Sequence, residues 1–187
     1  MKKVLFFIGT LFFTLNLSAQ FSLGAGLSLP IGSYADEEEG AASIGFVINS
    51  QRDWAINDVV GFTSKGFFGL NSVDTGNDNV EASPWMTFGG GAGLYVSPAE
   101  NFRFNAIVLY AYSLAPKIEA GGQEFLSRAG AGAVGFDIGA RYMFERFYIG
   151  VNFTTSTPTF TYEAGSSEFE IEQSVGYISI GGGFIFD

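Results

Sequence analysis

The sequence contains no cysteine and no histidine. These two absences exclude disulfide bonds, thiol nucleophiles, zinc sites built from Cys and His, and acid–base catalysis by imidazole. Basic residues are also scarce, with 9 Lys and Arg against 19 Asp and Glu, so the formal net charge is −10. A chain this anionic is not expected to bind nucleic acid.

Long hydrophobic runs are absent except at the N-terminus. Residues 1–20 read MKKVLFFIGTLFFTLNLSAQ, with Lys2 and Lys3 first, then an apolar core, then small residues before Gln20. This order predicts a secretory signal peptide over residues 1–19, followed by one domain over 20–187. The alternative is an uncleaved membrane anchor, but the apolar run is shorter than the ~20 residues of a spanning helix. No cysteine follows the cleavage site, which excludes a lipoprotein signal.

What the chain does contain is glycine (26 residues) and aromatic side chains (17%), in strict alternation. Within 131–157, the even positions from Val134 to Phe144 are apolar or aromatic, and the odd positions are mostly Gly or charged. After Glu145 and Arg146 the phase of the alternation switches. Because successive side chains of a strand point to opposite faces, this stretch predicts a hairpin with one oily face and one small, polar face.

The same alternation recurs along the chain and predicts eight strands. They fall at 21–31, 41–48, 54–70, 84–96, 102–114, 134–144, 147–157 and 174–186. Short turns at 49–53, 97–101 and 145–146 alternate with long, mostly acidic loops around residues 36, 76, 120 and 165. This layout predicts an all-β, eight-stranded antiparallel up-and-down transmembrane barrel, with acidic loops outside the cell and both termini periplasmic.

A secreted, soluble ligand-binding barrel is the rival architecture, with the same faces turned inside out. The interior of an eight-stranded barrel is just wide enough to be filled by side chains. The oily faces carry too many rings for that space, while the other face is rich in glycine. The rings are Phe21, Phe46, Phe62, Phe68, Phe88, Phe102, Phe104, Tyr110, Tyr112, Phe136, Tyr142, Phe144, Phe147, Phe153, Phe184 and Phe186. We therefore expect the oily face to meet lipid and the side chains of the other face to fill the lumen.

A few polar residues fall on the inward face and form the candidate site. They are Arg103, Asp137, Arg141, Asn105, Asn152 and Lys65. Charges in a lumen without bulk water must pair, because an isolated buried charge is costly. The structural hypothesis is a polar plug in which Arg103 joins Asp137 to Arg141. The functional alternative is an ion-conducting or gating pair in a narrow porin-like channel.

No catalytic, cofactor or metal site is expected, and the chain is not predicted to be an enzyme. Serines and carboxylates are present without histidine, so only a Ser–Lys or acid-only mechanism stays open. The run Gly89–Gly93 lacks the Gly-Lys-Ser/Thr ending of a phosphate loop. The acidic run 36–39 and the cluster Glu163, Glu168, Glu170 and Glu172 lack calcium-loop spacing. A solvated exterior is favoured over divalent-cation binding for both.

Taken together, the Ser18-Ala19-Gln20 junction, the eight alternating strands and the glycine-and-aromatic texture resemble a known family. It is the small outer-membrane β-barrel domain family of Bacteroidetes-type bacteria, and more distantly the OmpX/OmpA-like barrels. Ser64-Lys65-Gly66 is similar to a motif of the PorT-like branch. Phe186 matches the aromatic C-terminal signal of such barrels, although Asp187 follows it. The resemblance implies an outer-membrane protein in contact with lipid, inserted by the barrel assembly machinery, with a structural, adhesive or accessory role and an unknown external ligand.

Overall fold

A computed structural model describes residues 19–35, 41–77, 79–121, 123–164 and 167–186. The predicted signal peptide, apart from Ala19, lies outside these residues. The acidic run 36–39 and Asp187 lie outside them as well. Among the described residues, no helix is long and apolar enough to span a membrane.

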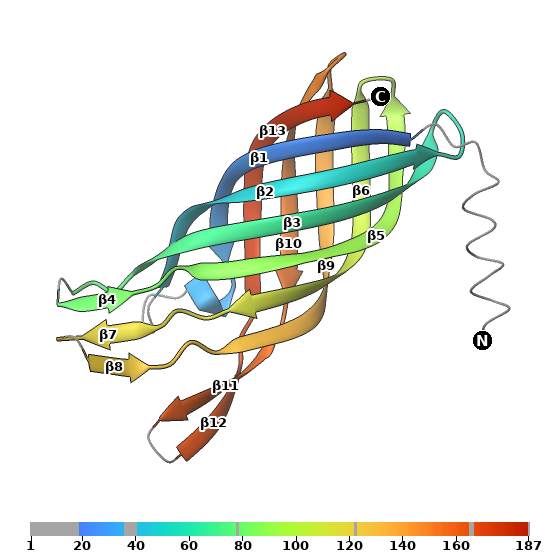
Figure 1. Cartoon of the computed structure of the whole chain (residues 1–187). Coiled ribbons are helices and arrows are strands. Elements are labelled where there is room, and N and C mark those ends of the chain that lie inside the picture. Colours follow the sequence, from blue (N-terminus) through green and yellow to red (C-terminus); the bar gives the residue numbers. More distant parts are fainter. Residues whose placement is uncertain (1–18, 36–40, 78, 122, 165–166, 187) are drawn as a thin grey trace, which may run out of the picture.

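Eight long antiparallel strands close into a barrel, as the alternation predicted (Figure 1). Their order around the wall is β1-β13-β10-β9-β6-β5-β3-β2, and β2 pairs with β1 to complete the circle. Closure leaves none of the eight with a free edge. The bounds are β1 (Ala19–Ile31), β2 (Ala41–Ala55), β3 (Val60–Asp74), β5 (Trp85–Ala99), β6 (Phe102–Leu114), β9 (Gly130–Met143), β10 (Phe147–Ser156) and β13 (Val175–Phe186).

The oily face of each strand points outward, as predicted. None of the aromatic residues assigned to that face is buried, and most are exposed. Val134, at 70% exposure, and Phe184, at 68%, are the extremes of this outward set. Inward positions alternate with them and are buried or half-buried. The soluble alternative would require the reverse arrangement.

The first short turn differs from its predicted place. Residues 49–53 are not a turn but part of β2, and the turn lies between Ala55 and Val60. Asn57 builds it, because its side-chain Oδ1 accepts from the backbone N–H of Val59 (2.9 Å) and of Val60 (2.8 Å). The sequence NSQRD is rich in turn-forming residues, but its inward positions are polar because they face a polar lumen.

The long loops also contain strands that the sequence did not predict. β4 (Val80–Ala82), β7 (Ile118–Ala120) and β8 (Gln123–Leu126) form a three-stranded sheet, and β11 (Thr159–Ala164) pairs with β12 (Ser167–Glu172). The short 3₁₀ helix η1 (Ser33–Ala35) follows β1. Figure 1 shows these small sheets beyond one end of the barrel, the long-loop end. The three short turns and the end of β13 lie at the opposite, short-turn end.

Inward glycines allow the wall of the barrel to curve tightly. A Cβ atom at Gly93 of β5 would overlap the carbonyl oxygen of Ala106 on β6, and one at Gly91 would overlap that of Val108. Any larger residue there would push the neighbouring strand away. The run Gly89–Gly93 is therefore a packing feature of β5 and not a phosphate loop.

We predict that Asn57→Ala lowers the free energy of unfolding by ~1 kcal/mol, because it removes two hydrogen bonds that hold the β2–β3 turn. Urea unfolding followed by tryptophan fluorescence measures the change. Asp58→Ala, at the next exposed position of the same turn, is the matched control and should change stability by less than ~0.5 kcal/mol. Equal effects from the two variants would contradict this role of Asn57.

Candidate functional site

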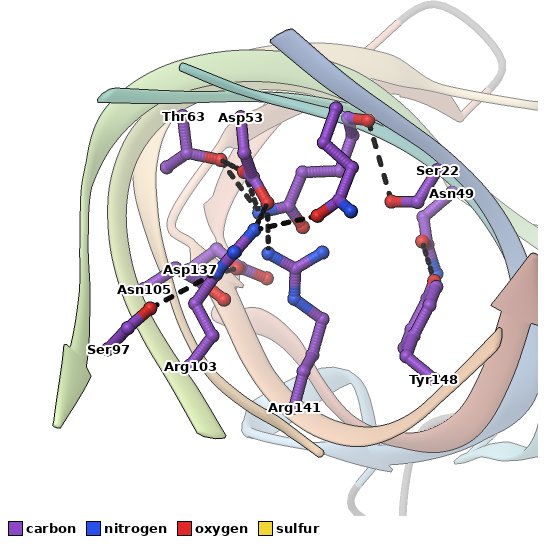
Figure 2. Close-up of polar contacts among 12 residues, drawn as sticks. Ser22, Asn49, Asp53, Thr63, Ser97, Arg103, Asn105, Asp137, Arg141 and Tyr148 are labelled. Atoms are coloured by element: carbon purple, nitrogen blue, oxygen red, sulfur yellow. Dashed lines mark hydrogen bonds and ion pairs between the residues drawn. The ribbon is translucent and has the colours of Figure 1, made fainter. Parts of the chain in front are cut away.

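The lumen at the short-turn end is organised around one carboxylate, that of Asp53 on β2. Its Oδ2 accepts from Arg103 Nη1 at 2.7 Å and from Arg141 Nη2 at 2.8 Å. Its Oδ1 accepts from the Thr63 hydroxyl at 2.6 Å and from Gln51 Nε2 at 3.1 Å. Figure 2 shows the two guanidinium groups, from the neighbouring strands β6 and β9, converging on this carboxylate across the lumen. One acid therefore ties β2, β3, β6 and β9 together across the barrel.

Aromatic rings support both arginines. The guanidinium carbon of Arg103 lies 4.4 Å from the centre of the Tyr95 ring, and that of Arg141 lies 5.5 Å from the Tyr148 ring. Arg103 also donates to Gln20 Oε1 at 3.2 Å. These contacts stabilise the positive charges where water has little access.

A second polar cluster lies further toward the long-loop end, around Asp137 of β9. Its side chain is fully buried, and its Oδ2 accepts from Lys65 Nζ and from the Thr154 hydroxyl, both at 2.6 Å. Asn105 Nδ2 donates to its Oδ1 at 3.0 Å. This acid therefore has one cationic partner and two neutral ones.

All six candidate residues face the lumen, but not in the predicted grouping. The hypothesis that Arg103 joins Asp137 to Arg141 is wrong, because both arginines contact Asp53 and Asp137 contacts Lys65. Asn105 belongs to the Asp137 cluster. Asn152 is buried without a hydrogen-bond partner for its Oδ1 atom.

Asp53 is the residue that sequence reasoning missed. It falls in the segment 49–53, which was assigned to a turn, although it has the same inward phase as Val47 and Gln51. Extending the alternation of β2 through this segment would have found it. The alternation could not show that Asp53 pairs with Arg103 and Arg141, because these residues lie 50 and 88 residues further along the chain.

Apolar side chains line the lumen from the height of Asp137 toward the long-loop end. One cluster contains Val47, Phe67, Ile107, Leu109, Ala111 and Tyr177. A cavity of about 10 Å³ remains beside Asn49, Tyr148 and Asn152. That is room for about one water molecule.

An aromatic cluster, here called the cap, covers the lumen at the long-loop end. Trp85 packs edge-on against Tyr34, with ring centres 5.3 Å apart, and against Phe160 at 5.7 Å. Phe160 comes from the β11–β12 hairpin and is fully buried. Burial raises the pKa of the Tyr34 phenol, so this group stays neutral in the cap. The hairpin and η1 thus cover the barrel at its long-loop end.

Chemically, this arrangement holds the described lumen charges in contact with groups of opposite charge. Both buried carboxylates are occupied by cations and hydroxyl groups. Among the described residues, no group of three or more Asp and Glu is placed to hold a metal ion.

Comparison with known proteins supports the fold. No family model matches the chain, and no curated protein sequence matches it. Among solved structures, it is similar to Ail, the attachment invasion locus protein of Yersinia pestis, with a TM-score of 0.61 at 12% identity, covering 90% of this chain and 99% of Ail. It is also similar to Neisserial surface protein A (TM-score 0.52, 13% identity, 90% and 96% covered). OprG of Pseudomonas aeruginosa gives a TM-score of 0.52 at 12% identity, with 90% and 95% covered. At these identities the likeness shows the fold, which is that of small outer-membrane barrels.

We predict that Asp53→Asn destabilises the barrel by ~3–5 kcal/mol, because it leaves two buried or half-buried arginines without their carboxylate. Asp137→Asn should lower the stability by less, because it leaves only Lys65 without a carboxylate. The neutral partners of residue 137, Asn105 and Thr154, remain in place. The midpoint of heat- or urea-induced unfolding in detergent, read from gel mobility, measures both. A larger loss for Asp137→Asn than for Asp53→Asn would contradict the assignment of Asp53 as the principal cross-barrel link.

Proposed function

We propose that this chain is an integral outer-membrane barrel with a sealed lumen, which serves as a rigid anchor for an acidic β-structured surface outside the cell. Its role is structural, adhesive or accessory. The observation that carries the proposal is the distribution of apolar and charged side chains between the outer and inner faces of the barrel. An apolar band surrounds the barrel, while ion pairs fill its centre.

The outward band favours lipid as the surroundings of the barrel. The exposed rings and aliphatic side chains cover every strand and form a continuous belt, far larger than the apolar patches of soluble monomers. Closure of the sheet satisfies the backbone, as hydrocarbon requires. Stacked rings such as Phe144 and Phe147, with centres 4.2 Å apart, lie beside a short turn, where barrels place an aromatic girdle.

The orientation follows the general layout of such barrels. Short turns face the periplasm and long loops face outward. On this orientation both ends of the barrel domain, at β1 and β13, lie on the periplasmic side, and a signal peptide over residues 1–19 would direct export. Insertion by the barrel assembly machinery is part of this proposal.

The filled lumen argues against the porin-like alternative. A conducting path would have to pass the cap, the apolar cluster and both ion-pair clusters. Each cluster is buried, and Asp53 and Asp137 have their oxygens occupied. Narrow barrels filled by side chains do not leave room for a water column.

The β11–β12 hairpin favours an adhesive or accessory role. One face of it buries Phe160 and Tyr162 in the cap, while Glu168, Glu170 and Glu172 alternate along β12 and are exposed. A structure of Ail contains the heparin analogue sucrose octasulfate, which is a polyanion. The acidic surface here fits a cationic partner instead. The Bacteroidetes-type and PorT-like assignment and the absence of enzymatic activity stay predictions.

We predict that Ile138→Arg, on the outward face of β9, destabilises the barrel in phospholipid vesicles. Its free energy of unfolding should fall by ~2–4 kcal/mol, because the substitution places a charge in hydrocarbon. Thr161→Arg, on the hairpin outside the barrel wall, is the control and should have little effect. Urea titration of vesicle-inserted protein measures both. If Ile138→Arg were as stable as the control, the band would not face lipid.

We further predict that the purified barrel gives no stepwise conductance in planar lipid bilayers. Phe160→Ala, which opens the cap, should also give no conductance steps, because the two ion-pair clusters still block the lumen nearer the short-turn end. Insertion is confirmed in the same samples by heat-modifiable gel migration. Reproducible conductance steps from the wild-type barrel would favour the channel.

A further inference from the structure

One charged residue stands out on the lipid-facing wall. Among the described residues of the eight barrel strands, Arg52 of β2 and Asp74 are the charged residues at outward positions, and Asp74 lies at the long-loop end. Arg52 is exposed within the apolar band, and no described carboxylate forms an ion pair with it. An arginine on the lipid face destabilises a barrel unless its charge is compensated.

The side chain of Arg52 is directed toward the short-turn end. Its guanidinium carbon lies 5.3 Å from the ring centre of Trp54, two residues nearer the β2–β3 turn. Trp54 pairs with Ala19, at the start of the barrel wall. Two residues correspond to ~7 Å along a strand, so the charge lies within reach of the membrane–water interface at this end.

Hydroxyl groups flank Arg52 on the same outward face. Ser64 of β3 is its cross-strand partner, and Ser50 lies one outward position further along β2. Most other outward positions at this height carry apolar side chains. At this height the described part of the outer wall therefore carries a small polar patch, made of Arg52, Ser50 and Ser64, which is here called the Arg52 patch.

An apolar groove continues from this patch toward the long-loop end. Ser50 pairs with Gly66, and Gly66 pairs with Gly90, so the wall is recessed where these side chains are missing. Gly90 then borders a groove of about 560 Å³ between Phe88, Tyr110 and Tyr112. A cation near the interface thus leads into an apolar channel along the outer wall, directed toward the membrane centre.

We propose that the Arg52 patch and this groove bind one glycerophospholipid of the leaflet at the short-turn end, and the proposal rests on the membrane placement proposed above. The guanidinium group takes the phosphate, with Ser50 and Ser64 as further donors, and an acyl chain lies over Gly66 and Gly90. Guanidinium matches phosphate oxygens in a bidentate geometry, which suits an arginine better than a lysine here. A second barrel copy fits less well, because Asp74, the one carboxylate at the described outward positions of the barrel strands, lies at the long-loop end, away from Arg52.

The test is native mass spectrometry of the full barrel in detergent with added dioleoylphosphatidylglycerol. We expect the wild type to retain one lipid, and Arg52→Gln to lower the retained fraction by about tenfold. Arg52→Lys should fall between them. Arg128→Gln, in a long loop, is the matched control and should bind as the wild type does.

Two further measurements define the ligand. Gly66→Leu should weaken retention by filling the acyl path, and an added Cβ there meets only the mobile Ser50 hydroxyl within 3.4 Å. Dioleoylglycerol, which lacks the phosphate, should not be retained. Inorganic phosphate should not displace the bound lipid, and displacement would assign the patch to a free anion and overturn the lipid proposal.

Each variant is first checked for heat-modifiable migration, which separates the two proposals. Failure of the wild type to fold in lipid or detergent would remove the membrane placement itself. A folded Arg52→Gln variant that retains lipid like the wild type would overturn the site alone. A lipid-free dimer of the wild type that is lost in Arg52→Gln would assign this face to a second copy and overturn the lipid proposal as well.

Discussion

Charges enclosed in a narrow barrel must neutralise one another, and this constraint organises the interior. Asp53 meets two guanidinium groups from strands on the far side of the lumen, and Asp137 meets Lys65. Each pair links strands that are distant in the sequence. Because removing one partner would leave a buried charge unpaired, we expect these contacts to stabilise the closed barrel. The apolar cluster and the aromatic cap add buried side chains to the interior on the long-loop side of these ion pairs.

The proposed sealed lumen has consequences for function. On that proposal a partner does not enter the lumen, because Asp53 and Asp137 are paired with cations and because Trp85 and Phe160 lie in the aromatic cap at its long-loop end. The surfaces left for recognition are the outer wall of the barrel and the small sheets beyond the wall. On the first, Arg52 supplies a lone charge. On the second, the glutamates of β12 supply an acidic face supported from beneath by the cap.

The sequence was most informative where the alternation was strict. It predicted the number of barrel strands, their antiparallel order and the direction of the apolar face. These features depend on a period of two and on the volume of the interior. It misplaced the β2–β3 turn, since polar inward residues of β2 resemble turn residues when the strand faces a polar lumen. It also missed β4, β7, β8, β11 and β12, which are too short for the pattern to stand out in acidic loops. The partner of Arg141 depends on the closure of the barrel across 88 residues, and no local pattern carries that information.

The central claim is that one face of every strand meets hydrocarbon while the other is enclosed, and the two tryptophans allow it to be tested directly. Trp54 lies on the outer wall beside Arg52, whereas Trp85 is buried in the cap. In vesicles containing brominated phospholipid, the fluorescence of a Trp85→Phe variant, which keeps Trp54, should be strongly quenched. A Trp54→Phe variant, which keeps Trp85, should be almost unaffected. Strong quenching of Trp85 with little quenching of Trp54 would contradict the arrangement of faces on which the structure and the proposed function depend.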